Sequence, residues 1–367
     1  MDRLSVLQHF REQEVAPLLN HQLDLLETTF HQCQGQLITD ILASFRQLCI
    51  QIHQQQEWGH QGPIGYIHYS LLRTQVLEQS YLYMVEAYSA GWYTDDSEIR
   101  CTYDASWAYA PLGQMVLELE QARKKYMGSI HPADVEHLVL GLIPHFHQYM
   151  KALLHLALPA AMELPEYQGI DKANRLMIRT GEYRDFSESV YIEDMEVRSA
   201  DERVEQLLQA DEDKPYIYEN LKQLAWPHLH IAERDLRYND FSHSELIASR
   251  FEACILIGSR WQYAALQGSS FEDSLLTDAD FRFSQLANTS FRRASALARR
   301  EGGERSPGLC GVRFEHACLD GVDFTDAEGF EHAYFEGASM QGTRVPHKYS
   351  QSWQLSELQS RSIIWTE

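Results

Sequence analysis

The sequence predicts a mainly helical α+β domain with a small antiparallel sheet, followed by a solenoid and a short tail. Three observations support this prediction. Apolar residues recur at helical spacing over the first sixty positions, tyrosines and β-branched residues are frequent over 64–104, and a large apolar residue stands at every fifth position over 231–291. The expected domains cover residues 1–223, 224–345 and 346–367.

The first domain begins with apolar spacing typical of two long amphipathic helices, which end before the Gly62-Pro63 pair. The tyrosine-rich stretch that follows, with turn signals at Ala90-Gly91 and Asp95-Asp96, is typical of a small antiparallel sheet. The remaining expected elements are helices over 106–127 and 132–158, a hairpin over 175–198, and a helix over 200–225. The second of these helices would start with Pro132 at its first position, where proline is favourable.

The second domain is defined by its five-residue period. Five residues match neither the 3.6-residue period of an α-helix nor the two-residue period of a strand, so the chain must turn a corner in every unit. A solenoid meets this requirement, because each coil buries its apolar residues against the next coil. The residues that we expect to form the core are Leu236, Phe241, Leu246, Phe251, Leu256, Trp261, Leu266, Phe271, Leu276, Phe281, Leu286, Phe291, Phe314, Leu319 and Phe324.

These units resemble the motif A(D/N)LXX of the pentapeptide-repeat family. The clearest matches are Ala279-Asp280-Phe281, Asn239-Asp240-Phe241 and Ala317-Cys318-Leu319, and the first domain lies outside the resemblance. The resemblance implies a right-handed quadrilateral β-helix in which four units form one square coil. With four units per coil, the alternation of leucine and aromatic residues would put leucines on one pair of opposite faces and aromatics on the other.

The period is interrupted by residues 297–309, which are rich in glycine, proline and charge and are predicted to leave the coil as a loop. The first interpretation of this segment is a tolerated surface insertion. The alternative is a loop that contacts a partner, because a cluster of arginines on an acidic chain reverses the local electric field. The candidate partner-binding residues are Arg292, Arg293, Arg299, Arg300 and Arg305.

Both ends of a solenoid need a cover, because each end exposes unpaired backbone groups. The helices of the first domain are expected to cover one end. The tail over residues 346–367 contains Trp353, Leu355 and Trp365, and it could either cover the other end or form a homodimer with a second copy. Both alternatives stay open at this point.

Sequence motifs give no indication of catalysis. No nucleotide-binding or hydrolase motif is present, and the six cysteines have no CxxC spacing. His145 and His147 stand two residues apart in the densest histidine cluster, a spacing that does not place both on one helix face. We therefore expect no catalytic residue, no metal site and no cofactor. An enzyme, or an accessory subunit of one, with its site in the first domain is kept as a second alternative.

Charge and hydropathy limit the function classes. Charged residues make up 23% and hydrophobic residues 44% of the chain, which excludes an intrinsically disordered protein. The net charge of −22 disfavours direct nucleic-acid binding, which needs an excess of lysine and arginine. The sequence has no apolar run long enough for a membrane span and does not start like a signal peptide, so we expect a cytoplasmic protein without membrane contact.

The resemblance implies one specific alternative, since members of this family protect DNA gyrase from quinolones by imitating duplex DNA. Such antibiotic-resistance proteins rely on an acidic rod. Here residues 231–345 contain 18 acidic and 12 basic residues, a net charge of −6, whereas residues 1–230 carry −16. Our first expectation is therefore a bacterial, non-catalytic module that binds a protein or peptide, with DNA mimicry as the alternative.

Overall fold

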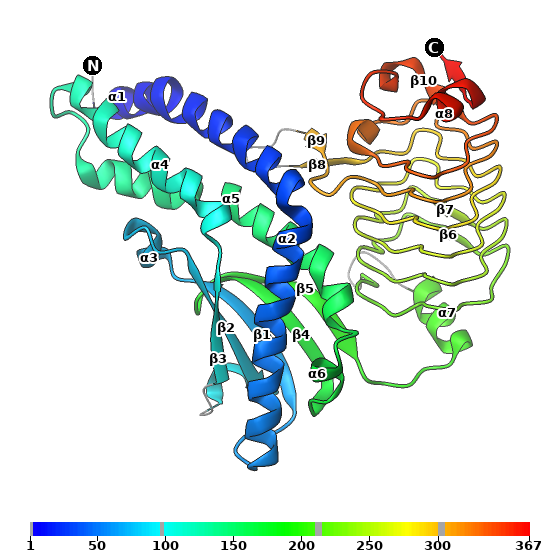
Figure 1. The fold of residues 1–367 in the computed structure, drawn as a ribbon, viewed down its shortest axis with the longest axis horizontal. Helices are drawn as coiled ribbons and strands as arrows, with labels where there is room; N and C mark the ends of the chain where they lie inside the picture. Colours follow the sequence, from blue (N-terminus) through cyan, green and yellow to red (C-terminus); the bar gives the residue numbers. More distant parts are fainter. Residues whose placement is uncertain (1–2, 96–98, 210–214, 300–304) are drawn as a thin grey trace. The chain divides into compact units, whose positions relative to one another are not determined.

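A computed structural model describes residues 3–95, 99–209, 215–299 and 305–367 (Figure 1). The chain divides into two compact units, Met1–Met195 and Glu196–Glu367. This division lies before the expected boundary at residue 223. The reason is that helix α7 (Ala200–Gln209) buries Val204 and Leu207 in the same hydrophobic cluster as the coil.

The first unit begins with one continuous helical stretch. Helix α1 (Arg3–Phe10) passes through a π-helical turn, η1 (Arg11–Val15), into helix α2 (Ala16–Glu57). The expectation of two separate helices is therefore wrong. The π-turn allows Phe10 and Val15, five residues apart, to be buried together on a stripe that otherwise follows spacings of three and four.

The two other long helices of this unit follow the sheet's first three strands. Helix α4 (Ser106–Ala122) continues as a 3₁₀ turn, η3 (Arg123–Tyr126), and helix α5 (Pro132–Ala161) begins at the expected proline. The carboxylate of Asp134 accepts the backbone N–H of His131 at 2.8 Å and thereby caps α5. Two short helices, α3 (Arg73–Leu77) and α6 (Pro165–Gln168), complete the set.

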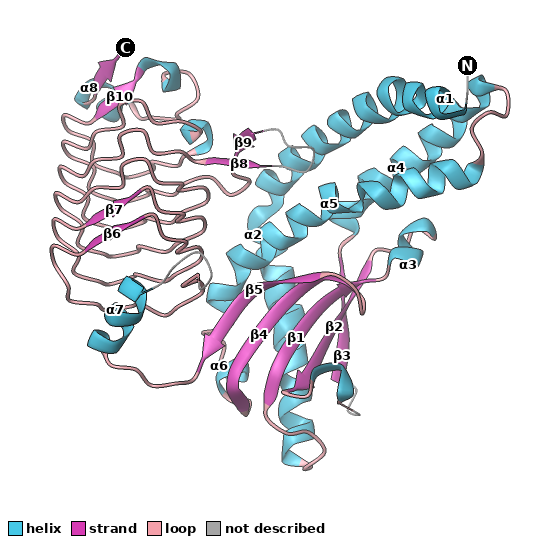
Figure 2. Ribbon diagram, turned by 180° about the vertical axis from the view of Figure 1, so that it is seen from behind, coloured by secondary structure: helices cyan, strands magenta, loops and turns pink. Residues whose placement is uncertain are grey.

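The sheet has five strands in the order β3-β2-β1-β4-β5. Their bounds are β1 Ile64–Leu71, β2 Leu82–Ser89, β3 Ile99–Asp104, β4 Lys172–Glu182 and β5 Ser187–Asp194. Strands β1 and β4 are parallel, so the sheet is mixed, and the expectation of a purely antiparallel sheet is wrong for this pair. The chain passes through α4 and α5 before it returns beside β1, and such a crossover permits parallel pairing. Helix α2 crosses one face of the sheet (Figures 1 and 2).

The second unit is a coil with four five-residue units per turn. Parallel bridges join residues twenty positions apart, for example Asp240 with Arg260 and Arg260 with Asp280. One such contact extends into a pair of short parallel strands, β6 (His230–Ala232) and β7 (Arg250–Glu252). All fifteen residues expected in the core have exposed fractions of 0%.

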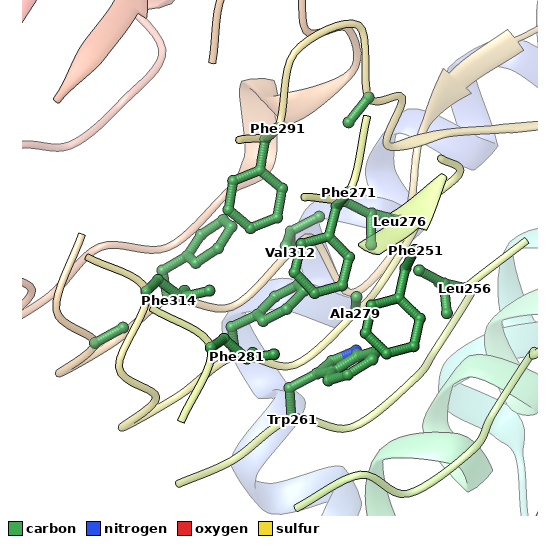
Figure 3. Close-up of a cluster of buried hydrophobic side chains, with 14 of the residues drawn as sticks. Phe251, Leu256, Trp261, Phe271, Leu276, Ala279, Phe281, Phe291, Val312 and Phe314 are labelled. Atoms are coloured by element: carbon green, nitrogen blue, oxygen red, sulfur yellow. The ribbon is translucent and has the colours of Figure 1, made fainter. Parts of the chain in front are cut away.

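Aromatic rings fill the interior in two columns (Figure 3). Phe271 stacks on Phe291 with ring centroids 5.2 Å apart, and Phe281 stacks on Phe314 at 5.3 Å. The columns meet edge to face, as between Phe271 and Phe281 at 5.4 Å and 81°. Offset-stacked and edge-to-face contacts are the preferred geometries of aromatic pairs, so the coil gains from both.

The interruption of the period forms a hairpin. Strands β8 (Leu297–Arg299) and β9 (Arg305–Pro307) pair antiparallel. Asp280 bridges to Arg313, which is thirty-three positions further along the chain. This separation is thirteen more than the usual twenty, and residues 297–309 account for the difference. The coil therefore resumes in register after the insertion.

Both ends of the coil are covered within the second unit. At the start, Arg203 of α7 donates to the carbonyl of Asn220 at 2.8 Å. The helix expected over 200–225 is shorter than predicted, because the chain has already entered the coil at Asn220, which bridges to Asp240. At the other end the tail packs on the last coil. The ring centroids of Trp353 and Phe335 are 4.2 Å apart, and the indole N–H of Trp353 donates to the carbonyl of Phe330 at 2.7 Å.

The tail contains two 3₁₀ or α-helical turns and one strand. These are η5 (His347–Tyr349), α8 (Glu357–Ser362) and β11 (Ile364–Thr366), and β11 pairs in parallel with β10 (Arg344–Pro346). A further 3₁₀ turn, η4 (Phe330–His332), lies in the last coils. Within the described part of the chain, no helix is long and apolar enough to cross a membrane.

Candidate interaction face of the repeat

Four of the five arginines suggested by the sequence are among the described residues, in or beside the pair of strands β8 and β9. Arg292 and Arg293 are exposed on the coil, and Arg293 forms ion pairs with Asp273 at 2.8 Å and Glu272 at 2.9 Å. These two carboxylates raise the pKa of Arg293. The pairing of β8 with β9 puts Arg299 opposite Arg305, while Arg300 lies outside the described residues.

Another surface of the coil carries a continuous column of exposed rings. His243 stacks on Tyr263 at 4.8 Å, Tyr263 on Phe283 at 4.9 Å, and Phe283 on His316 at 5.1 Å, with interplanar angles of 4–13°. The exposed fractions of Tyr263 and Phe283 are 53% and 38%. We call these four residues the aromatic ladder. They form a strip of stacked rings along the surface of the coil.

The backbone does not require aromatic residues at these positions. Each ladder residue has a left-handed backbone with φ between 58° and 60°, a conformation that costs L-residues roughly 1–2 kcal/mol. The equivalent position on other faces is often glycine, as at Gly268 and Gly321. Stacking returns about 0.5–1.5 kcal/mol per aromatic pair, which offsets much of this cost. At the end of the ladder, the ring of His316 covers Gly337, where a Cβ would lie only 2.3 Å from Nδ1.

A column of alternating charges runs beside the ladder. We call it the charged column; it consists of Asp240, Arg260, Asp280 and Arg313, which are joined in this order by parallel bridges. The guanidinium of Arg260 pairs with the carboxylate of Asp240. Asp280 accepts from Arg282 through both carboxylate oxygens, at 2.9 and 2.6 Å, and these bonds raise the pKa of Arg282. Arginines therefore neutralise the carboxylates on this surface.

The ladder and the charged column share one face of the coil. We define the ladder face as the outward residues of the units centred on Leu221, Phe241, Trp261, Phe281, Phe314 and Phe335. Sequence reasoning by unit missed this face, because the rings that stack on one another are at least twenty positions apart and never occur in the same five-residue unit. Reading the outward positions at intervals of twenty would have found His243, Tyr263 and Phe283.

The first unit contains a buried polar network near the histidine cluster. The hydroxyl of Tyr83 lies 2.7 Å from both the hydroxyl of Tyr109 and Nδ1 of His147. Burial raises the pKa of Tyr83 well above its usual value and lowers the pKa of His147 to about 4. All three side chains are therefore neutral near pH 7. Such groups can stabilise a core through hydrogen bonds, but burial here opposes the ionisation that would activate a tyrosine as a nucleophile.

A family model for pentapeptide repeats matches residues 254–293 in eight copies. No curated protein matches the sequence. Among solved structures, the chain is similar to the pentapeptide repeat protein Rfr23 from the cyanobacterium Cyanothece 51142, with 15% identity, coverage of 40% of this chain and 98% of that chain, and a TM-score of 0.29.

A second similar structure is QnrB1, a plasmid-mediated fluoroquinolone resistance protein, with 16% identity, coverage of 41% and 87%, and a TM-score of 0.24. A third is HetL from Nostoc sp. strain PCC 7120, a pentapeptide repeat protein involved in heterocyst differentiation regulation, with 17% identity, coverage of 35% and 75%, and a TM-score of 0.11. The five-residue period, the twenty-residue coil and the matching family model together show that the second unit contains pentapeptide repeats, in a chain that also has a separate N-terminal region.

Proposed function

We propose that this chain is a non-catalytic interaction protein whose coil presents the ladder face to a protein or peptide. The observation that carries the proposal is the row of four stacked and exposed rings, with Tyr263 and Phe283 at its centre. We also infer that the coil is a right-handed quadrilateral β-helix. The four units per turn and the facing aromatic columns support this geometry.

The coil suits this role because it holds the exposed side chains in fixed positions. Successive rungs are joined by backbone hydrogen bonds, such as Phe241 N–H to Arg260 O and Trp261 N–H to Asp280 O, both at 2.7 Å. A surface that is already ordered loses little conformational entropy on binding. Aromatic residues are also the side chains that contribute most strongly to protein interfaces.

DNA mimicry is less well supported by the charges on the coil. A mimic must present unneutralised negative charge at phosphate-like spacing, whereas Asp235, Asp240 and Asp280 are each paired with an arginine. Glu272 and Asp273 share a further arginine. A gyrase supercoiling assay with a quinolone tests this alternative. Protection of gyrase by the intact chain would favour mimicry, and no effect would remove it.

Site-specific photo-crosslinking tests the proposed interaction. A benzophenone amino acid at Phe283 lies on the ladder face, and the same substitution at Asn288 provides a matched control. Both positions are exposed and have left-handed backbones, with φ of 60° and 59°, but Asn288 belongs to a different face. We expect a protein adduct from position 283 and not from position 288 in the native lysate. Equal yields, or no adduct from position 283, would contradict the proposal.

A further inference from the structure

We propose that the ladder face docks against the ladder face of a second copy of this chain, with the two coils antiparallel. The inference rests on the proposed function to the extent that both use this face for protein contact. It goes further because it names the occupant. The order of side chains along the face is complementary to its own reverse.

The ladder face has three outward columns of six residues each. The first column, just before the buried residue, contains Asn220, Asp240, Arg260, Asp280, Arg313 and Tyr334. The second, just after it, contains Lys222, Ser242, Gln262, Arg282, Glu315 and Glu336. The third contains Gln223, the four ladder residues and Gly337.

Reversal of the charged column matches every charge with its opposite. A twofold axis across the face, between the rungs of Arg260 and Asp280, places Arg260 against Asp280 of the second copy and Asp280 against Arg260 of the second copy. The outer members, Asp240 and Arg313, pair in the same way. Arg260 and Asp280 keep 22% and 14% of their side chains exposed, whereas Asp240 keeps only 6%. The two central pairs therefore carry most of the complementarity.

The other two columns are compatible with the same axis. The aromatic ladder reads His-Tyr-Phe-His, so Tyr263 meets Phe283 of the second copy at the centre, and both rings are exposed. In the second column, Lys222 comes opposite Glu336, and no like charges face each other. A twofold axis parallel to the coil would instead place each charged residue at the same height along the coil as the identical residue of the second copy. The antiparallel arrangement is therefore favoured.

The size of the face determines what kind of dimer to expect. Three columns of six residues, of which Asp240 and Ser242 are already buried in the single chain, fall below the roughly 20–30 residues per side of a standard stable interface. We therefore expect a dimer that dissociates on dilution. Stacking of copies end to end is disfavoured, because α7 and the tail already cover the two ends of the coil.

Charge reversal tests this arrangement in the full-length chain by sedimentation velocity over a range of concentrations. Arg260→Asp brings Asp against Asp280 of the second copy twice, and Asp280→Arg brings Arg against Arg260 twice. Each variant alone is expected to self-associate about tenfold or more weakly, since like-charge contacts at an interface are costly. An equimolar mixture of the two variants forms only opposite-charge pairs across the axis, so association is expected to return.

The mixture keeps the test independent of folding defects. Arg260→Asp removes an ion pair to Asp240 within its own chain, but each chain in the mixture is identical to the chain measured alone. Arg250→Asp makes the same charge change at the equivalent position of another face, and it should leave association unchanged. A monomeric wild type at every concentration, or a mixture no better than the single variants, would overturn the inference. A crosslink from position 283 to a different protein would then leave the proposed function standing.

Discussion

Replacement of Phe281 by Ala is the most direct test of how the interior stabilises the coil. The ring is fully buried, stacks on Trp261 at 5.8 Å and on Phe314 at 5.3 Å, and contacts Phe271 edge to face. Large-to-small replacement of a buried aromatic costs about 3–5 kcal/mol, because apolar contacts are lost and a cavity remains. Phe283→Ala is a matched control two residues away, where the outward ring is 38% exposed. Its loss removes stacking of roughly 0.5–1.5 kcal/mol per aromatic pair.

Amide hydrogen exchange within the coil measures the difference in stability between the Phe281→Ala and Phe283→Ala variants. The N–H of Trp261 donates to the carbonyl of Asp280 at 2.7 Å and exchanges only when neighbouring coils separate. Since about 1.4 kcal/mol corresponds to a factor of ten, Phe281→Ala should accelerate exchange across residues 254–293 by roughly a hundredfold or more. Phe283→Ala should have a much smaller effect. Equal acceleration by the two variants would refute the assignment of stability to the inward column.

Three further predictions concern other parts of the chain. Burial lowers the pKa values of His68 and His147 to about 4, so below pH 6.5 the unfolded state binds protons that the folded state does not bind. Urea unfolding at a series of pH values should therefore show that the free energy of unfolding falls by roughly 3 kcal/mol per histidine between pH 6.5 and 4, and an unchanged free energy would contradict this. Gly258→Ala should lower the thermal midpoint more than Gly268→Ala, because only at Gly258 would a Cβ meet a tyrosine ring, at 2.5 Å, although both have positive φ. Truncation after Val345 removes the cover of the last coil and should lower the midpoint; an unchanged molar mass in light scattering would contradict a homodimer through the tail.

The sequence was sufficient for the arrangement inside the coil. The five-residue period identified the inward residues, including Phe314, Leu319 and Phe324 after the interruption, because each unit repeats the same local conformation. The same reasoning located the start of α5 at Pro132, since the fixed φ of proline suits the first turn of a helix. Local backbone preferences are readable from single residues and their spacing.

Pairings between distant segments were decided only by the tertiary structure. The parallel pairing of β1 with β4 depends on where the chain returns after two helices, and no local pattern encodes that position. The aromatic ladder likewise exists only because one coil takes twenty residues and the insertion of residues 297–309 leaves the register intact, which brings His316 onto Phe283 across thirty-three positions. The in-or-out direction of a side chain follows from its own unit, whereas its outward neighbours depend on how the whole coil closes.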